Sequence, residues 1–251
     1  MSRSFARAWV LVAVLALPAS AQCETFGVVP MVGRQLTFVT ADRRTGSNLD
    51  RNQYQYLPLG DEVFADAIDA TVSKVVRSRH ADDRTILVRL GLAASPEELA
   101  SPELVTKVIA AVAPKAVETG VTRLVVVAPY RAAPMLDVDD GHLGTGSAAG
   151  IGLYVSRFQR MGYVGAAASE YGFLGVFANV RVLVVDARSG TVVAEEVART
   201  GTVFPAVDAP DHDPVNALSP AKKIDYLKAL LGEAIEKVLP ALMDKASQAK
   251  P

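Results

Sequence analysis

Side chains that could bind a ligand gather between residues 41 and 58. Cationic and amide groups there can contact anions, and two tyrosines add amphipathic rings of the kind enriched at protein interfaces. Unstructured connections longer than about 12–15 residues are uncommon in compact domains and are often functional. The stretch leaves open a solvated loop whose tyrosines pack on the domain and a loop that binds a small ligand or a partner. The candidate binding residues are Arg43, Arg44, Asn48, Arg51, Tyr54 and Tyr56.

A second group of polar side chains lies in residues 205–218. Carboxylates and an imidazole can together hold a divalent ion. Prolines at 210 and 214 bracket the group and indicate an irregular loop. The pattern leaves open both a metal site and a plain polar surface loop. The candidate metal ligands are Asp208, Asp211, His212 and Asp213.

Residues 137–150 form a glycine-rich segment. A dinucleotide site needs G-x-G-x-x-G directly after a strand and opening a helix, whereas a further strand is expected to follow here. His142 and Ser147 share the segment, but the nucleophile elbow G-x-S-x-G is missing. We expect a flexible connection and assign neither a catalytic residue nor a cofactor. An exported hydrolase or metal-dependent enzyme that uses this segment or the Asp/His loop remains the alternative.

The elements that must position these groups follow from hydrophobic periodicity. They predict one α/β (α+β) domain over residues 22–247, a mixed sheet of about six strands with three main helices packed on it. Pro114 is expected to kink or divide the second helix, and Pro240 to bend or end the third. A flexible tail is expected at 248–251. The expected strands are 35–40, 85–90, 123–128, 151–158, 173–186 and 191–199, and the main helices begin at Asp61, Pro102 and Pro220.

The amino-terminal stretch indicates export. Arg3 and Arg7 give a basic start, residues 8–17 are apolar, and residues 19–21 form a small-residue cleavage site. The apolar run is shorter than the roughly 20 residues that span a bilayer. We therefore expect a signal peptide at residues 1–21, cleaved near Ala21, and a periplasmic or secreted mature protein.

Cys23 raises the alternative of an outer-membrane lipoprotein. Gln22 argues against it, because lipid-modifying processing favours a small residue directly before the cysteine. Formal net charge is −1 with no basic run, which excludes an electrostatic attraction to nucleic acid or to an anionic bilayer. Half of the residues are hydrophobic, which excludes disorder over most of the chain.

A resemblance to a known group enters through residues 177–193, with the sequence FANVRVLVVDARSGTVV. This stretch resembles the hairpin R-V-x-V-V-D-x-x-S/T-G-x-V of bacterial envelope proteins. Over about residues 104–200 the chain is similar to curli-secretion lipoproteins and to the amino-terminal domain of the TolB type. The resemblance implies a non-enzymatic assembly or interaction domain whose partner is another envelope protein. It carries over no catalytic residue, and a homo-oligomer stays open.

Overall fold

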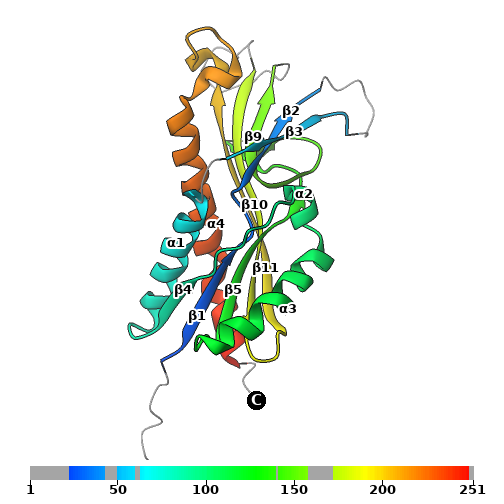
Figure 1. Ribbon diagram of the computed structural model, residues 1–251. Helices are drawn as coiled ribbons and strands as arrows, with labels where there is room; N and C mark the ends of the chain where they lie inside the picture. Colours follow the sequence, from blue (N-terminus) through cyan, green and yellow to red (C-terminus); the bar gives the residue numbers. More distant parts are fainter. Residues whose placement is uncertain (1–22, 43–49, 60–62, 140, 158–171, 249–251) are drawn as a thin grey trace, which may run out of the picture.

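The computed structural model describes residues 23–42, 50–59, 63–139, 141–157 and 172–248. The predicted signal peptide and its cleavage site therefore lie outside the described residues, and so does the predicted tail at 248–251 except for Gln248, which ends a helix. The fold is a mixed α/β arrangement, as the sequence predicts (Figure 1). Among the described helices, none is both long enough and apolar enough to cross a bilayer.

Two long strands form the axis of the sheet. β10 (Phe173–Asp186) and β11 (Val192–Pro205) are antiparallel along their whole length. The turn between them is the predicted tight hairpin: Gly190 has φ +68°, and the Asp186 carboxylate accepts the Ser189 N–H at 2.8 Å. This hairpin fixes the register on which the other strands assemble.

The opposite edge of β10 is shared by two groups of strands (Figure 1). The carboxyl-terminal half of β10 pairs with β5 (Arg123–Pro129), followed by β1 (Thr25–Pro30) and β4 (Arg84–Leu87). The amino-terminal half pairs with β9 (Ala148–Ser156), followed by β2 (Gln35–Thr40) and β3 (Gln53–Pro58). The sheet therefore forks, and β3 ends one branch.

Helices α1 (Val63–Arg79) and α4 (Pro220–Gln248) cover one face of the sheet along both branches. The other face is covered in two parts. At the β1–β5 branch, α3 (Pro102–Glu118) packs its aliphatic stripe on the strands. At the β9 branch, the cover comes from the segment that contains β6 (Arg131–Ala132), β7 (Leu136–Val138) and β8 (Gly141–Leu143).

Three glycines permit close contacts in this part of the sheet, and two of them make room for the second cover. A Cβ on Gly152 would lie 1.9 Å from the Thr37 carbonyl oxygen, which brings β2 and β9 into close contact. A Cβ on Gly175 would lie 2.5 Å from Leu136 Cδ1, and one on Gly201 would lie 2.3 Å from the Met135 carbonyl oxygen. The fully buried Leu136 therefore sits in a gap in the sheet surface that only glycine leaves open.

The three main helices are confirmed, and the strand count is corrected upward from about six to eleven within the described residues. The additional strands are short or lie in segments without an alternating pattern. α3 continues through Pro114 and α4 through Pro240, so neither proline ends its helix. The expected loop at 41–58 contains strand β3, and the expected flexible connection at 137–150 contains β8, a three-residue strand paired with β7.

Candidate functional site at strand β3

Strand β3 carries part of the predicted binding group. Tyr54 and Tyr56 alternate along it and therefore share one face, and Arg51 precedes it as an exposed side chain. The other three members, Arg43, Arg44 and Asn48, lie outside the described residues. The site is thus defined by the tyrosines and by the groups that the fold brings to them.

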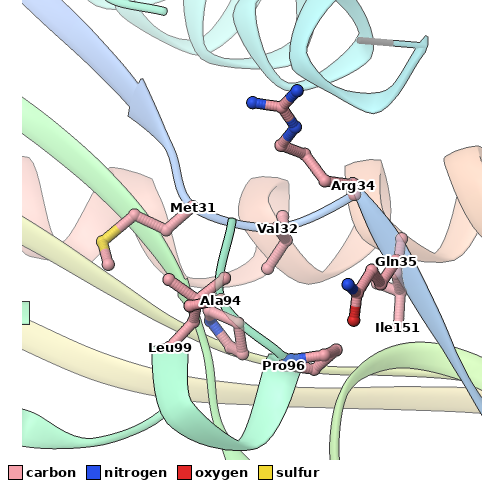
Figure 2. Close-up of a pocket in the computed structure, with 11 residues that line it drawn as sticks. Met31, Val32, Arg34, Gln35, Ala94, Pro96, Leu99 and Ile151 are labelled. Carbon is pink, nitrogen blue, oxygen red and sulfur yellow. The ribbon is translucent and has the colours of Figure 1, made fainter. Parts of the chain in front are cut away.

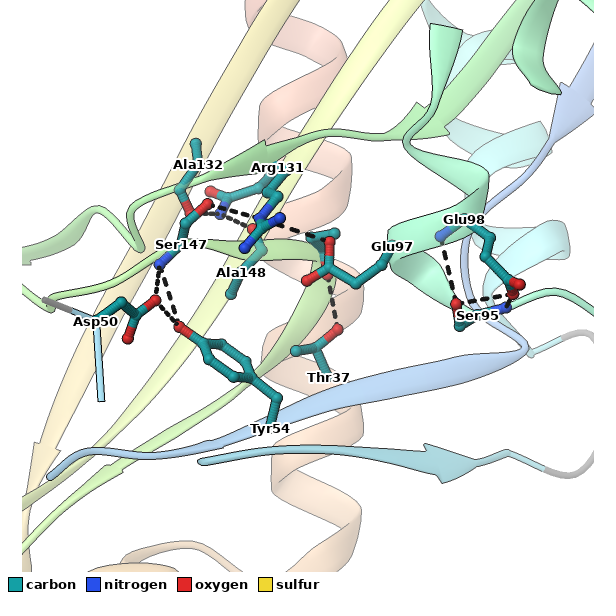
Figure 3. Close-up of polar contacts among 12 residues, drawn as sticks. Thr37, Asp50, Tyr54, Ser95, Glu97, Glu98, Arg131, Ala132, Ser147 and Ala148 are labelled. Carbon is teal, nitrogen blue, oxygen red and sulfur yellow. Dashed lines mark hydrogen bonds and ion pairs between the residues drawn. The ribbon is translucent and has the colours of Figure 1, made fainter. Parts of the chain in front are cut away.

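Tyr54 joins the edge of the sheet to the glycine-rich segment (Figure 3). Its hydroxyl donates to Asp50 Oδ2 at 2.5 Å. The Ser147 N–H points at the same two groups, 3.1 Å from Asp50 Oδ2 and 3.2 Å from the Tyr54 hydroxyl oxygen. Asp50, Tyr54 and Ser147 therefore form a closed triangle of hydrogen bonds between chain segments far apart in sequence.

A second connection runs beside the first. The Asn52 side-chain amide donates to the Thr145 carbonyl oxygen at 2.6 Å, and its backbone N–H donates to Asp50 Oδ1 at 3.0 Å. Gly146 has φ +80°, and a Cβ there would lie 2.5–2.6 Å from the side chains of Asn52, Asp50 and Tyr54. Glycine is required at this position both for its backbone conformation and for the close approach.

Arg131 extends the network toward helix α2 (Pro96–Leu99). Its Nε donates to Ser147 Oγ at 3.0 Å and lies 3.8 Å from Glu97 Oε2 (Figure 3). Glu97 also shares a hydrogen bond with the Tyr56 hydroxyl. The α2 helix is held by a capping box in which Ser95 Oγ accepts the Glu98 N–H, and Glu98 Oε2 accepts the Ser95 N–H at 2.8 Å.

Burial governs the ionisation of the site. It raises the pKa of Tyr54 to about 12, and the hydrogen bond to Asp50 acts in the same direction. Burial also raises the pKa of Tyr56, with the nearby Glu97 charge adding to the effect. For Glu97 burial raises the pKa, while Arg131 and the Tyr56 hydroxyl oppose the change. Both phenols are therefore protonated hydrogen-bond donors at neutral pH.

The side chains around Tyr54 and Ser147 can form hydrogen bonds and hold one another in place. The Ser147 hydroxyl accepts from a guanidinium, and its main-chain N–H is held by Asp50. His142, the other residue of the hydrolase alternative, pairs through Nδ1 with Asp137 at 2.7 Å, and both side chains are more than half exposed. The structure thus gives Ser147 and His142 different partners.

Two of the four predicted metal ligands, Asp211 and Asp213, hold the 205–218 loop together. Asp211 accepts from the Asp213 N–H at 3.0 Å and from the Asn216 side chain at 2.7 Å, and these bonds lower its pKa. Asp213 accepts the Val215 N–H and pairs with Arg157 at 3.1 Å. Asp208 ends the short helix η1 (Ala206–Asp208), ahead of η2 (Pro214–Ala217).

His212 takes a positive φ of +57° between these two carboxylates. Within the described ranges, no three His, Cys, Asp or Glu side chains are grouped so that they could hold a metal ion. The carboxylates are used as caps and as a partner for arginine, and this use supports the polar-loop alternative.

Two pockets are candidates for a small-ligand site. Residues 31–35, Ala94, Pro96 and Leu99 line one beside α2 (Figure 2). Its volume of about 10 Å³ suits at most one water molecule. The other, of about 490 Å³, lies near Cys23, where Arg123 pairs with Glu24 at 3.0 Å and Arg79 pairs with Asp244. Both arginines that line this pocket therefore form ion pairs within the chain.

Several site residues were not predicted from sequence. Asp50, Glu97, Arg131 and Ser147 come from four separate segments, and no spacing rule links them. The only available signal was the Ser-Pro-Glu-Glu helix start, which predicts α2 and thereby the position of Glu97.

Comparison with known proteins gives no assignment by sequence. No family model matches the chain, and no curated protein matches it. A solved Xanthomonas campestris protein of the family DUF330 is 10% identical with a TM-score of 0.36, covering 92% of this chain and 91% of that one. A PelC dodecamer from Paraburkholderia phytofirmans is 12% identical with a TM-score of 0.32, covering 90% and 91%.

A putative lipoprotein from Caulobacter crescentus is 20% identical with a TM-score of 0.22, covering 42% of this chain and 74% of that one. At these scores the likenesses assign neither a family nor a function. The resemblance to curli-secretion lipoproteins and to the TolB type stays a prediction.

Proposed function

We propose that this chain is an exported protein of the bacterial cell envelope that acts by binding other proteins, in the manner of an assembly or interaction domain. Strand β3 is the feature that carries the proposal. It ends one branch of the sheet, and within the described residues its only strand partner is β2. Strand edges of this kind bind extended segments of other chains through main-chain hydrogen bonds.

The polar groups beside β3 support a binding role over a catalytic one. Asp50, Tyr54 and Ser147 hydrogen bond to one another, and Arg131 spans from Ser147 to Glu97. This network braces β3 against the glycine-rich segment, so the strand presents its edge on a fixed support. The export signal predicted at residues 1–21 supports a location in the cell envelope.

Photo-crosslinking in intact cells tests the proposal. A photoreactive amino acid at the exposed Gln53 is expected to give discrete adducts with envelope proteins or with the chain itself. The matched control is the exposed Lys107 on α3, which is expected to give none. Equal adducts at both positions would contradict a specific surface at β3. Hydrolysis of ester, phosphate or glycoside substrates that disappears in His142→Ala would favour the enzyme alternative.

A further inference from the structure

The direction of the main-chain groups on β3 follows from its pairing with β2. Leu59 N–H donates to the Arg34 carbonyl oxygen at 3.0 Å, so these two residues form a hydrogen-bonded pair. In an antiparallel ladder such pairs alternate with pairs that do not hydrogen bond. The pairs of Tyr54 with Val39 and of Tyr56 with Thr37 are therefore of the second kind. Their N–H and C=O groups point away from β2.

The pairing of β2 with its other neighbour agrees with this assignment. Ala41 N–H donates to the Val155 carbonyl oxygen at 2.8 Å, so the odd-numbered residues of β2 direct their main-chain groups toward β9. Tyr54 and Tyr56 each present one donor and one acceptor at the outer edge. Pro58, the next outward position, presents only a carbonyl because proline has no N–H.

This edge differs from the other strand edges in its lack of charge. Gln53–Pro58 contains no Asp, Glu, Lys or Arg. By contrast, β4 has four residues and β8 has three, and the part of β11 not paired with β7 carries exposed Glu195, Glu196 and Arg199. Short length, charge and proline are among the devices by which proteins protect sheet edges from pairing. β3 has six residues, none of them charged, and carries proline only at its last position, Pro58.

We propose that β3 pairs antiparallel with β3 of a second copy of this chain, in a two-fold register centred on Gln55. The inference rests on the proposed function and names the partner for its surface. In this register Tyr54 lies opposite Tyr56 of the second copy, and the reverse pair follows by symmetry. Each pair exchanges two main-chain hydrogen bonds, so the outward N–H and C=O groups of Tyr54 and Tyr56 are all satisfied.

Registers shifted toward the carboxyl end of β3 are worse for a physical reason. Centring on Tyr56 would place Pro58 opposite Tyr54, and a hydrogen bond would be lost because proline has no N–H. If one strand slipped by a single residue relative to the other, the side chains of facing residues would lie on opposite faces of the sheet. The register on Gln55 also sets tyrosine opposite tyrosine twice, and aromatic pairs stabilise antiparallel strands. Figure 1 shows β3 at the margin of the sheet, away from α3 and α4.

Engineered disulfides test the register. In a Cys23→Ser background, Gln55→Cys is expected to form a disulfide-linked dimer, because facing residues of a non-hydrogen-bonded pair lie within disulfide range. Gln53→Cys is expected to stay monomeric alone and to cross-link with Leu57→Cys, its partner across the two-fold axis. Equal cross-linking of all single variants would reflect random collision and overturn the register.

Sedimentation of the protein without cysteine changes gives an independent measure. The fraction of wild-type dimer is expected to rise with protein concentration. Tyr56→Pro is expected to raise the dimer dissociation constant about tenfold or more, because each dimer loses two hydrogen bonds. Tyr56→Ala is the matched control, since it removes the same side chain but keeps the N–H. Equal effects of the two variants, or a wild type that stays monomeric, would overturn the second copy as partner. In the second case adducts of Gln53 with other proteins would still uphold the proposed function.

Discussion

One face of the sheet is covered by a helix at one end and by a strand-containing segment at the other. At the β1–β5 branch, α3 spreads its contacts over many aliphatic side chains, including Val108, Ile109 and Val112. At the β9 branch, a single leucine fills a gap between glycines, and a polar network around Tyr54 closes the edge. The packing of α3 is therefore stabilised by many contacts. The packing of the β6–β8 segment depends on a few contacts, and these contacts also support strand β3.

The largest effect is expected where the close contact of β2 and β9 requires glycine. Gly152→Ala should destabilise the protein by about 3 kcal/mol or more, because the new Cβ would meet the Thr37 carbonyl oxygen, a main-chain atom. Gly91→Ala is the control, since nothing lies within 4 Å of its Cβ position. Urea denaturation measures both, and equal midpoints would show that the close contact of β2 and β9 is not needed.

Leu136→Ala should cost about 2–5 kcal/mol, the usual range for a fully buried leucine. Ile109→Ala in α3 is the matched change at the other end of the sheet face. Hydrogen exchange should separate the two variants: Leu136→Ala is expected to speed exchange in β7 and β8, and Ile109→Ala to leave those strands unchanged. Faster exchange there in both variants would mean that the two covers act as one unit.

Tyr54→Phe should cost about 1 kcal/mol at neutral pH, through loss of the hydrogen bond to Asp50. The folded-state pKa of about 12 lies above the ordinary tyrosine pKa of 10.0. The neutral phenol is therefore favoured by folding, and its stabilising effect is complete below pH 10 and lost as the pH rises through 12. Alkaline unfolding should be steeper for the wild type than for Tyr54→Phe; identical curves would exclude this linkage.

The smallest effect concerns the support for Glu97. Ser95→Ala removes the side-chain cap of α2 and should cost about 1 kcal/mol. Thermal unfolding measures the loss. Ser101→Ala, which removes the cap of α3 at the other end of the face, is the matched control and should cost a similar amount.

Sequence reasoning predicted the parts of the fold that have a clear period. The apolar positions Phe64, Ile68 and Val72 are buried on α1, and the start of α2 follows from Ser95 and Glu98. Strand β3 was missed because Gln and Tyr alternate there without an aliphatic face, and long polar stretches favour a loop prediction. The strand is explained by its pairing with β2, which is a non-local interaction.

The site was predicted in part for a similar reason. Tyr54 and Tyr56 were named from residue type alone, and the fold brings both against the glycine-rich segment or α2. Arg131 and Glu97 could not be linked to them, because the contacts depend on how α2 and β6 pack beside β3. In the 205–218 loop residue types suggested a metal, but carboxylates cap turns as readily as they bind cations.

Amide hydrogen exchange by NMR at Tyr54, Gln55 and Tyr56 tests most directly whether the outer edge of β3 is the binding surface. In dilute protein, the amides of Tyr54 and Tyr56 should exchange quickly while that of Gln55, bonded to β2, is protected. At high protein concentration, or with an envelope extract added, the two tyrosine amides should become protected. Tyrosine amides that exchange at the same rate under all three conditions would contradict the account.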